Sequence, residues 1–349
     1  MALYNFDSHK LQYHPERISI WQNNTGIVYP LYLEISPTNA CNYSCQFCAL
    51  DYCSKNKEIK FLSFQCMDAI LSELSQCGLK SILYSGAGEP FMHPDMPRLI
   101  KLTHDSGIDT AVNTNMLLFV PEKINECLAE LTWLRISINA GAPETYSLIH
   151  KSPPDAFHKV LSNIEYAVEY KKKHKLKTTI GTQIVLIDDN IDEIVGLTGI
   201  MKKIGVDYFS VKPFNPHPKS GNICSVKKIT AERIIQAEKD IAHYQDNSFS
   251  VVFRKNSFMT MQRERRNYCE CNGLHFITFI KENGEIFPCL SLYGNKEYCY
   301  GNINDSSFHK IWTGQRRQEV LQRINDNFIG KTSANCRPIC RFDSINENF

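Results

Sequence analysis

Apolar and polar positions follow two alternating periods through the middle of the chain. Short runs rich in apolar residues predict strands, and apolar residues that recur every three or four positions between them predict amphipathic helices. The expected strands cover 31–36, 81–85, 109–113, 133–139, 178–186 and 207–212. The expected helices cover 63–77, 94–105, 121–130, 155–174 and 190–203. Strands that alternate with helices indicate right-handed βαβ units and a parallel sheet.

This periodicity allows two α/β architectures, a partial barrel or a doubly wound sheet, because six units are too few to close an eight-fold barrel. In both, ligands bind at the C-terminal ends of the strands. The alternation ends at the Pro-rich segment 213–218, and a helix over 230–245 follows. Asn283-Gly284 between the apolar runs 275–280 and 285–290 then predicts a β-hairpin.

The strand 133–139 has an unusual polar face. Period-two alternation places Arg135, Ser137 and Asn139 on one face and apolar residues on the other. The apolar face should meet the helices, so the polar face should look into the barrel. Polar side chains there are costly unless they bind something or form an internal hydrogen-bond network.

Composition narrows the chemistry. The net charge of +2 gives no reason to expect a nucleic acid or a membrane surface as partner, and no run of 18 uncharged apolar residues is present. The charged N-terminus is unlike a signal peptide, so we expect a cytoplasmic protein with reduced thiols. Disulfides then do not explain the 14 cysteines, most of which fall within 41–48 and 269–340. Metal sites do.

The first group has the spacing C-x3-C-x2-C: Cys41, Cys45 and Cys48. Three thiolates on one loop can each bind one iron of a 4Fe–4S cluster, which leaves the fourth iron without a protein ligand. A structural zinc site would need four protein ligands, so zinc is the weaker alternative.

This loop resembles the signature of the radical S-adenosylmethionine (SAM) superfamily. The resemblance implies a partial (β/α)6 TIM-like barrel in which SAM chelates the open iron of a 4Fe–4S cluster. An electron from the cluster then cleaves SAM to methionine and a 5′-deoxyadenosyl radical. Phe47 stands where the family places an aromatic residue beside the adenine.

Motifs at the ends of other strands also resemble the radical SAM superfamily. The segment 85–90, with Gly88 and Glu89, resembles the Gly-Gly-Glu-Pro motif that holds the SAM amino group, and Ala87 replaces its first glycine. We expect further cofactor contacts from Asn115, Ser137, Asn139, Gln183 and Lys212. A lysine within a strand is rarely buried unless an anion compensates its charge or it has a function. Lys212 is therefore expected to contact the SAM carboxylate, to contact a substrate or to reach solvent at the rim of the barrel.

The C-terminal cysteines resemble the SPASM/Twitch extension of this superfamily, which binds auxiliary 4Fe–4S clusters. A central C-x2-C pair is missing, so the one-cluster Twitch form fits better. The implied ligands of the auxiliary cluster are Cys271, Cys289, Cys336 and Cys340. Family spacing favours Cys271 over Cys269, and Cys299 is a bystander. Taken without the barrel, four such cysteines would also suit zinc.

The expected organisation is an N-terminal arm (1–30), a radical SAM barrel (31–215), a linker helix (216–265) and an auxiliary-cluster domain (266–349). The resemblance implies a radical SAM oxidoreductase or epimerase that abstracts a hydrogen atom from a substrate C–H, with a flavodoxin- or ferredoxin-type electron donor. A non-catalytic iron–sulfur or zinc scaffold is the alternative of another class.

Only 40 residues precede Cys41, and none resembles a leader-peptide-binding domain. We therefore expect a small-molecule substrate of the sugar or aminocyclitol type that is dehydrogenated or epimerised, with a peptide as the alternative. An epimerase needs a second hydrogen donor, for which Cys224 is the candidate.

Overall fold

The computed structural model describes residues 10–54, 57–222, 229–263, 266–328 and 336–349. Its strands are β1 (Tyr32–Ile35), β2 (Ser81–Tyr84), β3 (Asp109–Thr114), β4 (Trp133–Ser137), β5 (Thr179–Leu186), β6 (Tyr208–Pro213), β7 (Ser250–Phe253), β8 (Ile277–Ile280), β9 (Glu285–Phe287) and β10 (Gly301–Asn302). Its helices are α1 (Pro15–Asn23), α2 (Asp51–Ser54), α3 (Phe64–Gln76), α4 (Met96–Asp105), α5 (Pro121–Cys127), α6 (Pro143–His150), α7 (Ala156–His174), α8 (Ile194–Ile204), α9 (Ala231–Ala242), α10 (Lys255–Thr260), α11 (Phe308–Thr313), α12 (Gln315–Phe328) and α13 (Asp343–Asn346).

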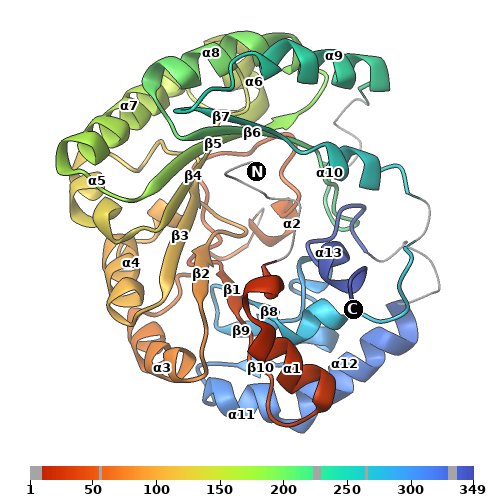
Figure 1. Cartoon of the computed structure of the whole chain (residues 1–349). Helices are drawn as coiled ribbons and strands as arrows, with labels where there is room; N and C mark the ends of the chain where they lie inside the picture. Colours follow the sequence, from red (N-terminus) through yellow and green to blue (C-terminus); the bar gives the residue numbers. More distant parts are fainter. Residues whose placement is uncertain (1–9, 55–56, 223–228, 264–265, 329–335) are drawn as a thin grey trace.

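The strands form one curved sheet in the order β10-β9-β8-β1-β2-β3-β4-β5-β6-β7. Neighbours from β1 to β7 are parallel, and α3, α4, α5, α7, α8 and α9 pack side by side around the outside of the curve (Figure 1). A doubly wound sheet would place helices on both faces. The partial-barrel prediction is therefore confirmed.

Local sequence signals explain where the elements begin and end. The Ser63 hydroxyl accepts a hydrogen bond from the Cys66 N–H at 3.3 Å and caps α3, and Gly78 follows the helix with φ of +76°. The apolar stripe of α3 is buried at Met67, Ile70, Leu71 and Leu74. Helix and strand predictions in the barrel agree with the structure to within a few residues.

The strand register separates an outer apolar face from an inner polar face. Leu134 and Ile136 of β4 are fully buried beneath the helices, whereas Arg135 alternates with them and is only half-buried. Arg135 pairs in register with Asn113 of β3 and Gly181 of β5. Because register partners in a parallel sheet share a face, the inner face is polar across several strands.

Three features differ from the sequence-based picture. The expected N-terminal arm contains α1, where the Arg17 guanidinium donates to the carbonyl oxygens of Tyr29 and Gly78 at 2.7 and 3.2 Å. A seventh parallel strand, β7, follows α9, and its four residues are too few for a periodicity signal. The C-terminal strand β8 pairs in parallel with β1, so the auxiliary region continues the barrel sheet.

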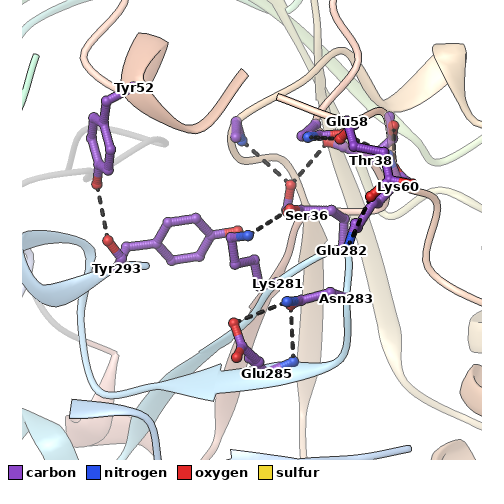
Figure 2. Close-up of polar contacts among 12 residues, drawn as sticks. Ser36, Thr38, Tyr52, Glu58, Lys60, Lys281, Glu282, Asn283, Glu285 and Tyr293 are labelled. Atoms are coloured by element: carbon purple, nitrogen blue, oxygen red, sulfur yellow. Dashed lines mark hydrogen bonds and ion pairs between the residues drawn. The ribbon is translucent and has the colours of Figure 1, made fainter. Parts of the chain in front are cut away.

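The predicted hairpin is present. Strands β8 and β9 are antiparallel, and Gly284 in the turn has φ of +84°, which favours glycine. The Asn283 side chain accepts from the Glu285 N–H at 3.3 Å and donates to the Glu285 carboxylate at 3.0 Å (Figure 2). Among the described residues, no helix is long and apolar enough to cross a membrane.

Candidate active site

The cysteine loop follows β1 at the C-terminal edge of the sheet. Cys41, Cys45 and Cys48 all carry free thiols. The pKa of Cys45 lies well above its ordinary value, first because protein surrounds its sulfur and then because the Cys41 and Cys48 sulfurs lie close to it. A buried thiol that resists ionisation beside two other cysteine sulfurs fits a site where iron atoms compensate the thiolate charge.

These side chains suit a cluster more than a single ion. Among the described residues, no three His, Cys, Asp or Glu side chains converge on one metal position. A 4Fe–4S cluster does not require such a point, because each thiolate binds a different iron.

The loop is held by backbone contacts on two sides. Ser44 and Gln46 donate their N–H groups to the carbonyl oxygens of His150 and Ile149 at the end of α6, at 3.2 and 2.9 Å. On the other side, the Asn222 amide donates to the Cys48 carbonyl at 3.0 Å. Helix α6 and the segment after β6 therefore position the three sulfurs together.

His150 touches the loop directly, and sequence reasoning missed it because no motif marks it. Its Nδ1 lies 3.1 Å from the Cys45 Sγ, and its Nε2 lies 3.3 Å from the Asn139 side-chain nitrogen. Burial lowers the pKa of His150 to about 3, so the imidazole is neutral. Because the Asn139 nitrogen donates to Nε2, the ring proton belongs on Nδ1, directed at the sulfur. The predicted adenine contact, Phe47, packs edge-on against the same imidazole at 5.9 Å.

The turn after β2 approaches the loop closely at Gly88. A Cβ atom there would lie 2.3 Å from the Ala40 carbonyl oxygen and 2.5 Å from that of Thr38. Only glycine permits this approach. Ala87, which replaces the first motif glycine, is itself buried without such a conflict, so the departure from the motif is tolerated.

Glu89 is buried behind this turn as a hydrogen-bond acceptor. It accepts from the Thr114 hydroxyl at 2.6 Å, the Asn115 N–H at 2.7 Å and the Phe91 N–H at 3.2 Å. Burial nevertheless raises its pKa to about 7. The Asn115 amide also donates to Asn42 of the cysteine loop at 2.8 Å, which places the Glu89 carboxyl group beside the thiols.

Two buried amide atoms have no hydrogen-bond partner within the described part of the chain: Asn42 Nδ2 in the cysteine loop and Gln183 Oε1 in β5. Gln183 pairs in register with Ser137 and Ser210 on the inner face of the sheet. Buried polar atoms without partners are costly, so they fit a site that a polar ligand such as SAM completes.

The side chain of Asn139, a predicted SAM contact, is already engaged in hydrogen bonds within the protein. Its side-chain carbonyl oxygen accepts from the Val185 N–H at 2.7 Å, and its amide nitrogen faces His150. These bonds match the internal network that the strand pattern also allowed. The predicted hydrogen donor Cys224 lies outside the described residues.

Lys212 of β6 shares the inner face of the sheet with Arg135, and Arg254 directly follows the neighbouring strand β7. Burial first, and then Arg135, Arg254, Arg337 and Arg341, hold its pKa well below the ordinary value for lysine. Arg337 and Arg341 come from the C-terminal segment, each directly after a predicted cluster ligand. The two Cys-Arg pairs, at 336–337 and 340–341, are the sequence signal that could have indicated these arginines.

The second cysteine group gathers the four thiols predicted as ligands. Burial and the Cys336 sulfur raise the pKa of Cys289 to about 12. Burial, together with Asp343, Cys271 and Cys289, raises the pKa of Cys340. The four thiols therefore act on one another electrostatically, which supports the predicted auxiliary cluster.

Two neighbouring cysteines point elsewhere. Cys269 is exposed, and the Cys299 thiol donates to the Gly301 carbonyl at 3.3 Å. Cys271 in preference to Cys269, and Cys299 as a bystander, stay predictions that this geometry supports.

A short chain of hydrogen bonds connects the region after the cysteine loop to the second cysteine group. Tyr52, four residues after Cys48, donates its hydroxyl proton to the Tyr293 carbonyl at 3.1 Å (Figure 2). The same hydroxyl lies 3.3 Å from His217 Nε2, which in turn lies 3.0 Å from the Leu290 carbonyl beside Cys289. The cysteine loop and the C-terminal region therefore share one hydrogen-bonded contact.

Comparisons with known proteins agree with this arrangement. Residues 35–199 match the radical SAM superfamily, and residues 269–341 match the iron–sulfur cluster-binding domain called SPASM. A tungsten-containing aldehyde ferredoxin oxidoreductase cofactor-modifying protein of Pyrococcus furiosus is 24% identical over 334 residues, which cover 89% of this chain and 88% of that protein. A GTP 3′,8-cyclase of Chlorobaculum tepidum is 23% identical over 275 residues, which cover 74% of this chain and 78% of the cyclase.

Solved structures share the fold. Streptococcus suis SuiB bound to its precursor peptide SuiA superposes with a TM-score of 0.65 and 18% identity, over 88% of this chain and 70% of SuiB. The protein anSMEcpe with bound AdoMet superposes with a TM-score of 0.59 and 18% identity, over 84% of this chain and 83% of anSMEcpe.

Proposed function

We propose, on the premise that the chain belongs to the radical SAM superfamily and carries a C-terminal SPASM domain, that it abstracts a hydrogen atom from a C–H bond of a small polar substrate. A ferredoxin- or flavodoxin-type protein is the electron donor in this proposal. When bound, the 4Fe–4S cluster supplies the electron that cleaves SAM to methionine and a 5′-deoxyadenosyl radical, which takes the hydrogen atom.

The chain's own residues bind and orient the reactants. Cys41, Cys45 and Cys48 hold the cluster and leave one iron open. Glu89 accepts hydrogen bonds from the SAM amino group, and its own three donors keep the carboxyl group in place. Gln183 offers a buried carbonyl oxygen on the inner face of the sheet.

The convergence of these groups carries the proposal. The thiol triad lies beside a buried carboxyl group. Within the described residues, buried amide atoms without partners lie in the cysteine loop and on the inner face of β5. A scaffold that merely stores a cluster needs neither the carboxyl group nor the unpartnered amides.

Curated relatives support a small-molecule substrate. The cyclase acts on GTP, as its name states, and the Pyrococcus protein modifies a cofactor. Neither name specifies a sugar or an aminocyclitol, so we propose only a small polar molecule whose C–H bond gives a hydrogen atom to the 5′-deoxyadenosyl radical. A peptide substrate is the second candidate, since SuiB binds a precursor peptide within a similar fold.

Cleavage of SAM without substrate tests the proposal. Cys45→Ala in anaerobically reconstituted protein should abolish the formation of 5′-deoxyadenosine with dithionite as reductant, because one iron of the cluster loses its ligand. Cys66→Ala, on the outer helix α3, is the matched control and should cleave SAM as the wild type does. If Cys45→Ala still forms 5′-deoxyadenosine, the assignment of the site is wrong.

A further inference from the structure

Five basic side chains lie in or beside the barrel strands, and among them only Lys212 is also a predicted SAM contact. Arg135 lies in β4, Lys212 in β6 and Arg254 directly after β7, and Arg337 and Arg341 come from the C-terminal segment. We call these five residues the cationic group. Lys212 and Arg254 occupy neighbouring positions of adjacent strands, because Val211 pairs in register with Phe253 and the Arg254 N–H donates to the Val211 carbonyl at 2.9 Å. All four arginines add to the effect of burial in lowering the pKa of Lys212.

Several of these side chains are held in fixed positions. The Arg337 guanidinium donates to the Asn215 carbonyl at 2.6 Å, after β6. Arg341 donates to the Tyr32 hydroxyl at 2.7 Å and pairs with Glu34 at 2.6 Å, both in β1. The C-terminal segment therefore brings Arg337 beside the end of β6 and Arg341 beside β1.

Two members of the cationic group, Lys212 and Arg135, have no carboxylate partner within the described residues, whereas Arg341 pairs with Glu34. Arg135 instead donates to the Asn113 side chain at 3.0 Å and lies over the Trp133 ring at 4.6 Å. Clustered cations without an acidic partner are rarely buried, because desolvation and mutual repulsion both oppose them.

The auxiliary cluster accounts for only part of this charge. Arg337 and Arg341 follow the predicted ligands Cys336 and Cys340, so the cluster thiolates offset their charge. Arg135 and Lys212 belong to barrel strands and share the inner face with Gln183 across the β4–β5–β6 register. Lys212 is half-buried and Arg341 keeps 38% of its side chain exposed, so a solute can reach the group.

We propose that the substrate carries a phosphate or carboxylate group and that the cationic group, with Lys212 as a direct contact, binds this anion. The inference rests on the proposed function only for the location of the substrate beside SAM. A bound anion would supply the negative charge that Lys212 and Arg135 lack and would hold the rest of the substrate between the cysteine loop and the C-terminal region.

Calorimetry with small anions tests this inference. Pyrophosphate represents a phosphate-bearing substrate and malonate a carboxylate-bearing one, and each is titrated into reconstituted protein saturated with SAM. The wild type should bind at least one of them. Lys212→Met should weaken that binding about tenfold or more, because a hydrogen bond to a charged group is lost. Lys203→Met removes an exposed lysine on α8 and should leave binding unchanged.

The remaining outcomes also decide the matter. Binding of pyrophosphate alone, malonate alone or both supports the proposal and identifies the anion. The proposal is overturned if the wild type binds neither probe, or if Lys212→Met and Lys203→Met weaken binding equally. It is also overturned if Lys212→Met lowers SAM affinity or iron content instead, since the charge would then serve a cofactor. SAM cleavage without substrate is scored separately, so its failure would refute the proposed function and leave anion binding to be judged alone.

Discussion

At the scale of single residues, two buried side chains beside the cysteine loop, Glu89 and His150, bear directly on how SAM and the cluster are held. The spacing of Cys41, Cys45 and Cys48 is a local pattern that is visible in any sequence. His150 contacts Cys45 across more than a hundred positions, and only the fold brings them together. Cys224 and the hydrogen-donor role given to it stay predictions.

Glu89 should give SAM binding a pH dependence. Its pKa of about 7 means that the carboxyl group is mostly protonated at pH 6 and mostly ionised at pH 7.5. Because the ionised form accepts hydrogen bonds from the SAM amino group, affinity should rise with pH, by up to roughly eightfold over this interval. Calorimetric titration of SAM at both pH values measures the change. A Glu89→Gln variant should show a smaller rise, and an equal rise in the variant would remove Glu89 from the cause.

His150 should tune the cluster that Cys45 holds. A hydrogen bond to a ligand sulfur favours the reduced cluster, which carries more negative charge. His150→Phe keeps a planar ring and loses the bond, so the midpoint potential should become more negative while the iron content stays unchanged. A redox titration followed by electron paramagnetic resonance measures the potential. His158→Phe, an exposed change on α7, should leave the potential alone. A wild-type potential in His150→Phe would contradict this role.

At the scale of elements, the barrel strands and helices were predictable because each long element has a strong period and recognisable caps, as α3 illustrates. The short strand β7 was missed, since four half-buried residues show no clear alternation. The hairpin turn was found from Asn283-Gly284 alone. The parallel pairing of β8 with β1 was not predicted, because strand partners far apart in the sequence leave no local signal.

Gly88 should control how the turn after β2 meets the cysteine loop. Gly88→Ala places a methyl group against the backbone oxygens of Thr38 and Ala40, so one segment must move. We expect a loss of about 1–3 kcal/mol in the free energy of unfolding and a lower occupancy of the SAM-binding cluster. Thermal melts and iron analysis measure both effects. Gly196→Ala on α8 meets no atom within 4 Å and should preserve stability and iron content. Full cluster occupancy and wild-type stability in Gly88→Ala would refute the steric explanation.

At the scale of the whole molecule, the structure joins what the sequence suggests are separate domains. Strand β8 extends the barrel sheet beyond β1, and Tyr52 connects the cysteine loop to the carbonyl of Tyr293. The domain limits 31–215 and 266–349 remain predictions. The substrate is the least predictable feature, because it depends on how side chains from distant elements, such as Lys212 and Arg341, come together in the fold.

The central claim is that the chain holds two 4Fe–4S clusters, one on each cysteine group. Iron and sulfide analysis of anaerobically reconstituted protein tests it most directly, with the wild type beside a Cys41/Cys45/Cys48→Ala variant. A Cys66/Cys77/Cys127→Ala variant controls for the loss of three thiols. We expect about eight irons in the wild type and the control, and about four in the triple-loop variant. About four irons in the wild type and none in the loop variant would contradict the claim, since the C-terminal cysteines would then hold no cluster.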